Sequence, residues 1–491
     1  MNFDSAQLAI SAPLVATIAG GLLLLLLEAF AGGKNRAYLM PLTVLACAGA
    51  LALTAVGWLD AAPDSGSRAI FSGMLSFDRL SLFLDGIFLT AAALTAMMAE
   101  PYMREHRFEF GELYALLLFA TAGMMILASA TDLVTIFLGV ETMSLAVYVL
   151  TGSWRRSAKS SEAAMKYFLT GAFATAILLY GMALIYGAAG STNLAAIAAA
   201  SPKLATQPIF LIGVLLLLAA LAFKIAAVPF HMWAPDAYEG APTPVTGFMA
   251  AGIKAAGFSV LIRLCTSALA GKDLAFGSSG WASLLAVIAV ATMTVGNLAA
   301  LRQDNVKRML AYSSIAHAGY LLIGVVALAV IGADARGPLL FYLAAYTFTT
   351  LGAFGVVAWL GSRGDERLQL DDWAGLASRH PAAALAMTLF MLSLGGIPPT
   401  AGFFGKFYLF RAALEKAGMV NLVVIAVLNS VVSVFYYLRV VTAMYFREVG
   451  REPAPLRSTA MNAALVIAAL AVIGIGLAPG WLISAAAAAV N

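Results

Sequence analysis

The feature that most constrains this chain is a series of apolar runs, each about 20 residues long, that recurs from one end of the sequence to the other. A run of that length crosses roughly 30 Å of hydrocarbon as an α-helix, in which every backbone polar group is satisfied internally. Hydrophobic residues make up 62% of the 491 positions and charged residues 11%, a composition that soluble domains do not sustain over this length. The sequence therefore predicts an all-α, multi-pass membrane protein.

We expect about fourteen transmembrane helices, joined by loops too short to fold as separate domains. Lys and Arg residues, Lys307 among them, concentrate in the loops that follow odd-numbered spans, which the positive-inside rule places in the cytoplasm. Both termini are then predicted to lie in the periplasm, with the chain in the bacterial inner membrane. The approximate spans are 10–30, 38–59, 80–99, 112–130, 132–152, 163–187, 208–230, 243–267, 281–301, 308–331, 338–360, 382–411, 419–445 and 460–485.

Two of these spans are interrupted by helix breakers. Span seven runs into the proline-rich segment "PFHMWAPDAYEGAPTP", and span twelve contains "SLGGIPPTAGFFGKF". Proline lacks a backbone donor and clashes with the preceding turn, so both helices should be broken or partly unwound there. Unwound backbone at membrane depth is tolerated only where protein or a water-filled cavity satisfies its polar groups, so both breaks are expected to line a cavity.

The two broken spans are five helices apart, which suggests two repeats made of spans four to eight and nine to thirteen. A unit with an odd number of helices reverses its direction in the membrane when it is copied, so the repeats should be inverted, as in many transporters. The alternative is that two proline kinks arose independently. The repeats divide the chain into an N-terminal three-helix segment (1–111), a first repeat (112–267), a second repeat (281–445) and a C-terminal helix (446–491).

Charged residues also fall at mid-membrane positions. A charge at that depth costs roughly 2.5–3.5 kcal/mol on insertion scales, so several of them together need a functional reason. The proton affinity of a buried Lys depends on whether a carboxylate is close or distant, and a series of such groups can accept a proton on one side and release it on the other. We therefore interpret four residues as a proton relay: Glu141 in span five, Lys224 at the break in span seven, Lys254 in span eight and Lys406 after the break in span twelve.

The structural alternative is that each charged side chain snorkels to an interface or pairs with an opposite charge. Snorkelling suits Lys166, Arg263 and Arg439, which lie near the ends of their spans. It does not suit Lys254, because a stem that reaches about 6 Å cannot cover the roughly 15 Å to either interface. Pairing with Glu141 accounts for one lysine and leaves an excess of buried base.

The histidines occupy different kinds of position. His317, inside span ten, could carry protons between the two repeats together with Tyr320, although a satisfied core histidine is the alternative. His231 lies in the break of span seven and could be a relay group on the cytoplasmic side. His106 and His380 are expected at the surface.

The remaining polar residues and motifs do not predict further chemistry. Glu28 and Asp85 lie nearer the ends of their spans and are interpreted as structural or interfacial, and Asp132 as a charge at a helix N-terminus. Cys47 and Cys265 have no spacing partners, so they predict neither a disulfide framework nor a metal site. The sequence contains no phosphate-binding loop, dinucleotide fingerprint or haem-attachment motif, so any energy source must come from elsewhere.

Taken together, these motifs resemble the antiporter-like membrane subunits of the proton-pumping NADH:quinone oxidoreductase, complex I. The resemblance covers essentially the whole chain. Lys406 favours the subunit N branch, the counterpart of mitochondrial subunit 2, because subunit M typically has glutamate there. The resemblance rests on Glu141, Lys254, "AFKIAAVPFHMWAPDAYEGAPTPVTGF", "QDNVKRMLAYSSIAHAGY" and "LSLGGIPPTAGFFGKF".

The resemblance implies a role for each relay residue. Glu141 and Lys224 would form an ion pair in the first half, Lys254 would link the halves, and Lys406 would be the distal group of the second half. Pumping would be driven by electron transfer in partner subunits, which would hold NADH, FMN, iron–sulfur clusters and quinone, with no cofactor bound here. The implied neighbours are the antiporter-like subunit M, the small subunits K and J, the lateral helix of subunit L, and lipids.

Two other classes stay open. A cation/proton antiporter subunit would share the fold and the relay, and acidic cation ligands near a break would favour it. A purely structural membrane scaffold would need none of the buried lysines. The basic residues form no patch, so no nucleic-acid partner is expected.

Overall fold

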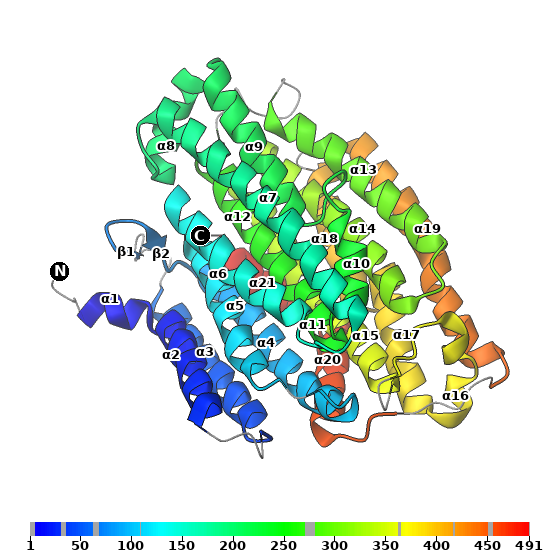
Figure 1. The fold of residues 1–491 in the computed structure, drawn as a ribbon. Coiled ribbons are helices and arrows are strands. Elements are labelled where there is room, and N and C mark those ends of the chain that lie inside the picture. Colours follow the sequence, from blue (N-terminus) through cyan, green and yellow to red (C-terminus); the bar gives the residue numbers. More distant parts are fainter. Residues whose placement is uncertain are drawn as a thin grey trace.

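The structure is a computed structural model that describes residues 5–30, 36–61, 68–108, 110–270, 280–361, 365–415, 418–449 and 455–490. Nearly all of these residues are helical, and Figure 1 shows the helices packed into one bundle. A short antiparallel ribbon, β1 (Ala69–Ile70) with β2 (Leu75–Ser76), precedes the fourth helix, with Ala69 opposite Ser76. The predicted all-α membrane fold is confirmed.

The helices follow the order expected from the apolar runs. The N-terminal part forms α1 (Ser5–Ile10), α2 (Ala12–Phe30), α3 (Leu39–Asp60) and α4 (Arg79–Glu105). The first half continues with α5 (Glu112–Ser129), α6 (Leu133–Thr151), α7 (Ala158–Ala189), α8 (Leu194–Leu204), α9 (Pro208–Lys224), α10 (Trp233–Gly240), α11 (Thr243–Phe248), the π-helical turn η1 (Met249–Ile253) and α12 (Lys254–Thr266). The second half forms α13 (Trp281–Leu301), α14 (Val306–Ile331), η3 (Gly332–Ala335), α15 (Arg336–Leu360), η4 (Leu370–Trp373), α16 (Leu376–Arg379), α17 (Pro381–Gly395), α18 (Ala401–Glu415) and α19 (Val420–Phe446), and is followed by α20 (Thr459–Leu477) and α21 (Gly480–Ala488).

Length and apolar composition identify 11 membrane-spanning candidates among the described residues. One of these candidates, Val306–Leu360, contains both α14 and α15. The interrupted spans fall short of the required length, because the breaks end α9 and α17 after 17 and 15 residues. The total of fourteen spans therefore stays a prediction.

The most deeply buried crossing is the one that carries Lys254. The segment Thr243–Thr266, formed by α11, η1 and α12, is 100% buried in its apolar window, whereas the windows of α2 and α3 are 28% buried. In Figure 1, α2 and α3 lie at one edge of the bundle and α13 and α19 at the opposite edge. The polar residues of the central crossing are thus surrounded by protein.

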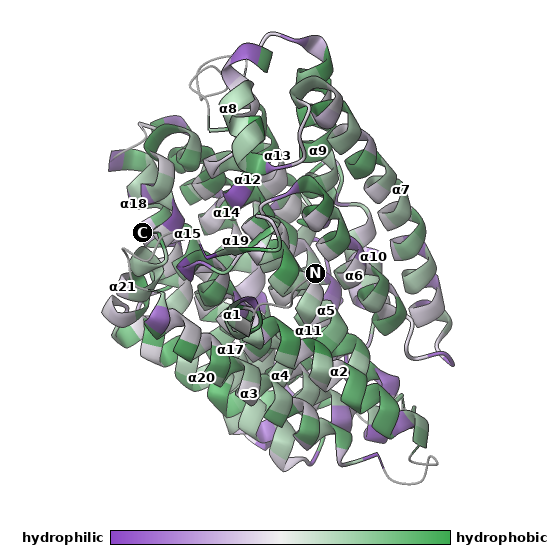
Figure 2. Ribbon diagram, turned by 90° about the vertical axis from the view of Figure 1, so that its left-hand side faces the viewer, coloured by the Kyte–Doolittle hydropathy of each residue, from purple (hydrophilic) through white to green (hydrophobic). Residues whose placement is uncertain are grey.

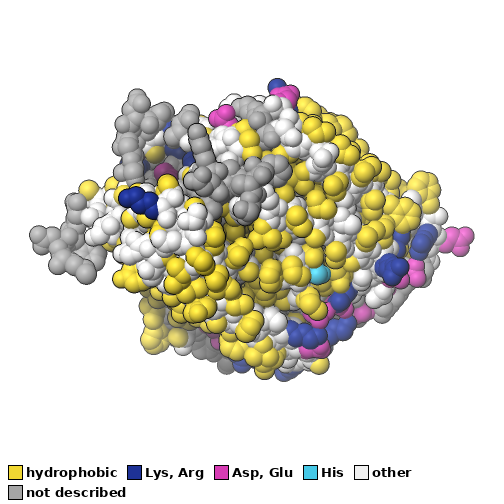
Figure 3. Space-filling view, turned by 90° about the horizontal axis from the view of Figure 1, so that it is seen from above, with side chains coloured by type: hydrophobic (Ala, Val, Ile, Leu, Met, Phe, Trp, Pro, Cys, Tyr) yellow, Lys and Arg dark blue, Asp and Glu magenta, His cyan; other side chains and the backbone are white. Residues whose placement is uncertain are grey.

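The outer surface is apolar, as expected for a protein surrounded by lipid. Figure 2 shows apolar residues dominating the long helices, with many polar residues at helix ends. In Figure 3 apolar side chains cover most of the visible face, and charged side chains gather along one edge. Such a surface suits contact with lipid tails or with other membrane subunits.

Both predicted helix breaks are present. The helix of span seven ends at Lys224 and resumes at Trp233 as α10, so eight residues separate the two pieces. The helix of span twelve ends at Gly395 and resumes at Ala401 as α18.

The two breaks have the same backbone geometry. One residue in each break adopts the left-handed conformation: Ala226 (φ 58°), two residues after the end of α9, and Gly396 (φ 80°), directly after the end of α17. The next N–H in each break bonds back five residues, from Ala227 to Ala222 at 2.8 Å and from Ile397 to Leu392 at 3.0 Å. Each break also contains a cis X–Pro bond, Val228–Pro229 and Pro398–Pro399. Both helices thus end in a Schellman-type turn, which supports the predicted repeat.

Two boundaries differ from the sequence prediction. The last span was expected to run to residue 485, but α20 ends at Leu477 and α21 begins after Pro479, so the C-terminal segment holds two helices. Proline is compatible with the start of a helix and not with its interior, which explains the new start. The connection between spans six and seven contains α8, whose start is capped by the Asn193 side chain.

Several expectations about single residues are confirmed. Asp132 caps the start of α6, where its carboxylate accepts the N–H of Val134 at 2.8 Å. Lys166 keeps 46% of its side chain exposed and pairs with Glu162 at 2.7 Å.

Three expectations are wrong. Arg263 does not snorkel, because it is 8% exposed and pairs with Asp78 at 2.7 Å. His106 is not a surface group, since it is 4% exposed and its ring lies against that of Tyr102 at 4.3 Å between centroids. For Asp85 the interfacial alternative is wrong, because the residue is wholly buried, whereas the structural alternative stays open; neither carboxyl oxygen has a hydrogen-bond partner among the described residues.

Candidate functional site

Three lysines lie in the interior of the bundle, and each stands at a helix discontinuity. Lys224 is the last residue of α9, Lys254 is the first residue of α12 after the π-helical turn, and Lys406 lies in the second turn of α18 beyond the break. Their exposed fractions are 4%, 2% and 5%. The snorkelling alternative is therefore wrong for all three, and their ammonium groups must be satisfied by buried acceptors.

Lys224 is satisfied by hydroxyl groups of α6. Its Nζ donates to Ser144 Oγ at 2.8 Å and reaches the Tyr148 hydroxyl at 3.5 Å. Ser144 is one helical turn beyond Glu141, so the lysine meets the same face of α6 that carries the carboxylate.

Glu141 does not form the direct ion pair with Lys224 that the resemblance implies. Its Oε1 accepts the Thr175 hydroxyl of α7 at 2.7 Å, and no ion pair joins it to Lys224 among the described residues, where Lys224 donates to Ser144 and Tyr148. Ser144 is the group that meets the ammonium instead. Glu141 is half-buried, whereas the three lysines are buried.

Lys254 is held by a single residue of α14. Its Nζ donates to the Ser314 carbonyl and to Ser314 Oγ, the latter at 2.5 Å. No carboxylate pairs with it in the described part of the chain. The π-helical turn η1 directly precedes Lys254, and such turns interrupt the regular bonding of a helix, often at functional positions.

A glycine brings the helix of Lys254 close to the break beside Lys224. A Cβ at Gly257, one turn after Lys254, would lie 2.7 Å from Ile225 Cγ2. The missing side chain therefore permits the close approach of α12 to the residue that follows Lys224.

His317 connects α14 to two other helices. Its Nδ1 lies 2.7 Å from the Tyr342 hydroxyl of α15, and its Nε2 lies 3.2 Å from the Tyr437 hydroxyl of α19. Tyr437 also bonds to Ser313, which is adjacent to the Ser314 that holds Lys254. His317 is thus a satisfied core histidine in a polar network next to Lys254.

Lys406 completes this network. Its Nζ donates to the carbonyls of Leu394 and Gly395, at 3.0 and 3.1 Å, and to Ser430 Oγ at 2.9 Å. These carbonyls end α17, where the helix dipole places partial negative charge. Tyr320 lies between His317 and Lys406, because the centre of its ring is 5.6 Å from that of His317 and 4.9 Å from Lys406 Nζ.

A cavity of about 490 Å³ opens beside Lys406. Ser430 and Gly396 line its inner part, and Arg411 and Glu415, which are more than half exposed, line its outer part. The cavity therefore lies between the buried ammonium and the surface at the far end of α18.

The two secondary candidates differ. Tyr320 belongs to the site, because Lys406 Nζ lies 4.9 Å from the centre of its ring and its hydroxyl accepts Asn297 Nδ2 at 3.0 Å. His231 is half-buried at the first break, and its Nδ1 has no hydrogen-bond partner among the described residues. No hydrogen bond joins its side chain to Lys224 within the described ranges, where Lys224 donates to Ser144 and Tyr148.

Sequence reasoning missed the hydroxyl groups that connect the charges. Serine and tyrosine are common in membrane helices, so single ones do not stand out from an apolar span as a lysine does. A usable signal was present in the "YSSIAH" segment, where two adjacent serines precede the histidine by one turn. The missed residues are Ser144, Ser313, Ser314, Tyr342, Tyr437 and Ser430.

Residues 130–433 match the protein family described as "NADH:quinone oxidoreductase/Mrp antiporter, TM". The matched region contains the four charged residues that the sequence predicts to form a relay and is well over half of the chain. The chain belongs to this family.

Curated relatives cover nearly the full length. The chain is 49% identical over 489 residues to "NADH-quinone oxidoreductase subunit N 1" of Sorangium cellulosum, with 95% of each chain covered. It is 47% identical over 492 residues to "NADH-quinone oxidoreductase subunit N" of Trichlorobacter lovleyi, with 100% of this chain and 98% of the relative covered. The expected resemblance to the subunit N branch is confirmed.

Solved structures show the same fold. A chain of respiratory complex I from Thermus thermophilus is 35% identical, superposes with a TM-score of 0.80, and is matched over 97% of this chain and 99% of its own. A chain of the Mrp complex from Dietzia superposes with a TM-score of 0.84 at 23% identity, covering 98% of this chain and 97% of its own. At 23% identity, the similarity to the Mrp chain shows a shared fold alone.

Proposed function

We propose that the chain is the proton-translocating subunit N of NADH:quinone oxidoreductase, complex I. The observation that carries the proposal is the series of buried polar residues from Lys254 through Ser314, Ser313, Tyr437 and His317 to Tyr320, whose ring lies 4.9 Å from Lys406 Nζ. Buried ionisable residues are costly in a membrane protein, and they typically mark ion pathways and proton relays. The relatives named above are subunits of this kind.

The proton moves between the lysines under the control of Glu141. When Glu141 approaches Lys224, its charge stabilises the ammonium. When the two are apart, as here, the Lys224 proton is held only by hydroxyl groups and moves toward Lys254. The serine and tyrosine hydroxyls then carry it to Lys406, because each can accept one proton while donating another.

The energy for pumping enters from outside the chain. Moving one charge against the membrane potential costs about 2.3 kcal/mol per 100 mV, and nothing in the relay supplies that work. Electron transfer from NADH to quinone in partner subunits, which hold FMN and iron–sulfur clusters, is the source. This subunit has the role of a translocase component in a respiratory enzyme, without a redox centre of its own.

The exposed apolar faces suit neighbouring membrane subunits and lipid. Large apolar residues are exposed on the outer helices, for example Leu26 on α2, Leu428 on α19 and Leu470 on α20. We assign these faces to the antiporter-like subunit M, the small subunits K and J, the lateral helix of subunit L, and lipids. The two halves form inverted repeats, residues 112–267 and 281–445, supported by the matching turns at Ala226 and Gly396.

The chain lies in the bacterial inner membrane with the end that carries Lys307 in the cytoplasm and both termini in the periplasm. In that orientation the cavity beside Lys406 opens toward the periplasm, because α18 runs away from the cytoplasmic end. Lys406 is then the release group of the relay.

The test replaces single lysines in the intact complex. Lys254→Ala and Lys406→Ala should abolish NADH-driven proton uptake by inside-out membrane vesicles, while Lys166→Ala, which removes an exposed lysine, should leave it unchanged. The amount of assembled complex and its electron transfer to an artificial acceptor are measured alongside. If the two buried-lysine variants keep proton uptake and lose sodium or potassium exchange, the chain is a cation/proton antiporter.

A further inference from the structure

The end of the bundle predicted to be cytoplasmic holds a buried lysine that the relay does not use. Lys307, the second residue of α14, has 0% of its side chain exposed, although the sequence places it among the loop charges. Its Nζ donates to the Ala241 carbonyl at 2.6 Å and to Glu366 Oε1 at 3.3 Å. A lysine so near a helix end would normally snorkel to water, so this inward position is unusual.

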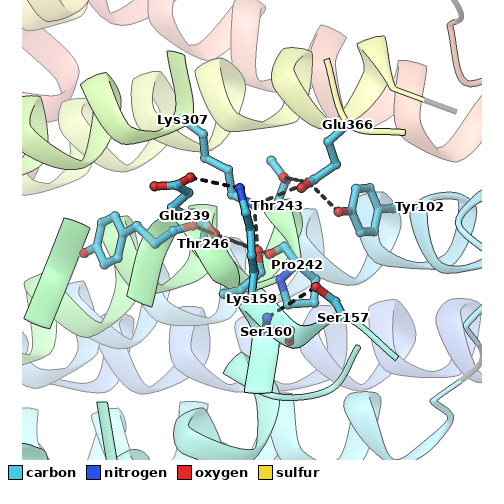
Figure 4. A network of polar contacts seen from close by, with 12 residues as sticks. Tyr102, Ser157, Lys159, Ser160, Glu239, Pro242, Thr243, Thr246, Lys307 and Glu366 are labelled. Atoms are coloured by element: carbon cyan, nitrogen blue, oxygen red, sulfur yellow. Dashed lines mark hydrogen bonds and ion pairs between the residues drawn. The ribbon is translucent and has the colours of Figure 1, made fainter. Parts of the chain in front are cut away.

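Glu366 joins this lysine to solvent. Its Oε1 accepts three donors, the Tyr102 hydroxyl at 2.5 Å, the Thr243 hydroxyl at 2.6 Å and Lys307 (Figure 4). Its Oε2 forms no hydrogen bond with the described residues, and 19% of the side chain is exposed. One oxygen therefore belongs to the interior network and the other remains open to water.

Polar groups lead from this carboxylate toward the relay. Thr243 begins α11, the helix that continues through η1 to Lys254. One turn further along, the Thr246 hydroxyl donates to the Tyr238 carbonyl at 2.8 Å. The Tyr238 hydroxyl in turn interacts with the side chain of Ser314, the residue that holds Lys254.

We propose that Glu366 is the group through which protons enter the relay from the cytoplasm. A proton from water binds the open oxygen of Glu366 and neutralises the carboxylate, so the attraction to Lys307 is lost. The carboxylic acid then turns its O–H bond inward and gives this proton to a water molecule, and a proton passes from that water through the Tyr238 hydroxyl and Ser314 to Lys254, each hydroxyl accepting one proton as it releases its own. The carboxylate then pairs again with Lys307. Lys307 is a positioning residue, because it stays protonated on the Ala241 carbonyl throughout.

The charges around Glu366 fit this role. Burial alone would raise the pKa of its carboxyl, but the Lys307 ammonium and the two hydroxyl donors outweigh burial and hold the pKa below its usual value. His106 also faces the carboxylate, and burial lowers the pKa of its imidazole, so it is uncharged near neutral pH. The titratable groups that face Glu366 are Lys307, Tyr102 and His106, and the charges acting on these from further out are Glu239, Lys159, Glu105 and Asp365.

The proposal depends on the relay described above and has its own test. NADH-driven proton uptake by inside-out vesicles that contain the whole complex is measured from pH 6 to pH 8 for Glu366→Gln. This variant keeps an oxygen acceptor and cannot carry a proton, so uptake should fall at least about tenfold at pH 8. At pH 6, where protons in water are a hundred times more abundant, uptake should return to within about twofold of the wild type. Glu366→Asp, which keeps a carboxylate, should recover part of the lost uptake at pH 8.

The controls separate entry from structure. Asp371→Asn removes a carboxylate at the same end whose side chain is 90% exposed, and it should behave as the wild type at every pH. Thr243→Val keeps the side-chain shape and removes one hydroxyl that donates to Glu366 Oε1, so it should lower uptake at pH 8 by less than Glu366→Gln does. A loss that does not vary with pH in both variants, or a matching loss in Asp371→Asn, would overturn the proposal. If Lys254→Ala shows normal proton uptake, the proposed relay itself is wrong. If Lys254→Ala loses uptake and Glu366→Gln keeps the wild-type rate, the relay stands and only the proposed role of Glu366 as the entry group is wrong.

Discussion

Ser144 is the group that keeps Lys224 satisfied without a carboxylate, so its hydroxyl is the most direct place to perturb the relay. Ser144→Ala removes one oxygen and leaves the Lys224 ammonium with the Tyr148 hydroxyl at 3.5 Å. A hydrogen bond to a charged group contributes about 1.5–3 kcal/mol, and each 1.4 kcal/mol corresponds to about tenfold in an equilibrium. We therefore expect NADH-driven proton uptake to fall by about ten- to a hundredfold.

The matched control is Ser129→Ala. Ser129 is wholly buried near the end of α5, and its hydroxyl bonds only to carbonyls of its own helix, Met125 at 2.8 Å and Ile126 at 3.3 Å. The same atoms are removed, but no charge loses a partner, so uptake should stay near the wild-type rate. Ser144→Thr, which retains a hydroxyl, should recover most of the uptake lost in Ser144→Ala.

Inside-out vesicles with equal amounts of assembled complex provide the assay, with the initial rate of NADH-driven proton uptake as the readout. Equal rates in Ser144→Ala and Ser129→Ala would refute the reasoning, because the Lys224 proton would then move without help from the hydroxyl that holds it. A loss in Ser144→Thr as deep as that in Ser144→Ala would show that packing at this position matters and the hydroxyl does not.

Two further predictions concern stability. A Cβ at Gly402 would lie 1.9 Å from the Ser393 carbonyl oxygen, so Gly402→Ala should push α17 and α18 apart. We expect a destabilisation of at least about 1–3 kcal/mol, seen as a lower unfolding temperature of the complex in detergent. Gly474→Ala is the control and should be neutral, because a Cβ at Gly474 would have nothing within 4 Å. Burial raises the pKa of the Asp78 carboxyl, but the Arg263 guanidinium lowers the pKa by more than burial raises it. The folded-state pKa therefore lies below the unfolded value of about 3.9. The stability that Asp78 contributes is then present above that value and lost as pH falls through the folded pKa, so the difference in unfolding temperature between wild type and Asp78→Asn should shrink below about pH 4.

The sequence was sufficient to locate the buried lysines because a charge inside an apolar run is rare. Lys224, Lys254 and Lys406 stand out from their surroundings, and the prolines beside two of them mark the broken helices. Both features are local, so they can be recognised without knowing how the helices pack. The same reasoning located Glu141, which is the only carboxylate near the centre of its span.

The connections between these charges could not be read in the same way. Tyr437 reaches His317 across 120 positions of sequence, and Ser430 reaches Lys406 from another helix, so these contacts exist only once the bundle is packed. Lys307 was counted among the loop charges for a related reason: it precedes the predicted start of its span, and only the fold shows that it is buried beside Glu366.

The separation of Glu141 from Lys224 also limits how energy can reach the relay. Two unit charges at an effective dielectric constant near 20 attract by about 4 kcal/mol at 4 Å and about 2 kcal/mol at 8 Å, so a shift of one side-chain length changes the interaction by about 2 kcal/mol. That is close to the 2.3 kcal/mol or so needed to move one charge through 100 mV. Glu141 is half-buried and held by the Thr175 hydroxyl, so a charge presented by a neighbouring subunit can act on it without entering the protein core. The lysines, at 2–5% exposure, are screened from such contact, so in the proposed relay the carboxylate is the residue through which a neighbour would control whether the Lys224 proton stays or moves.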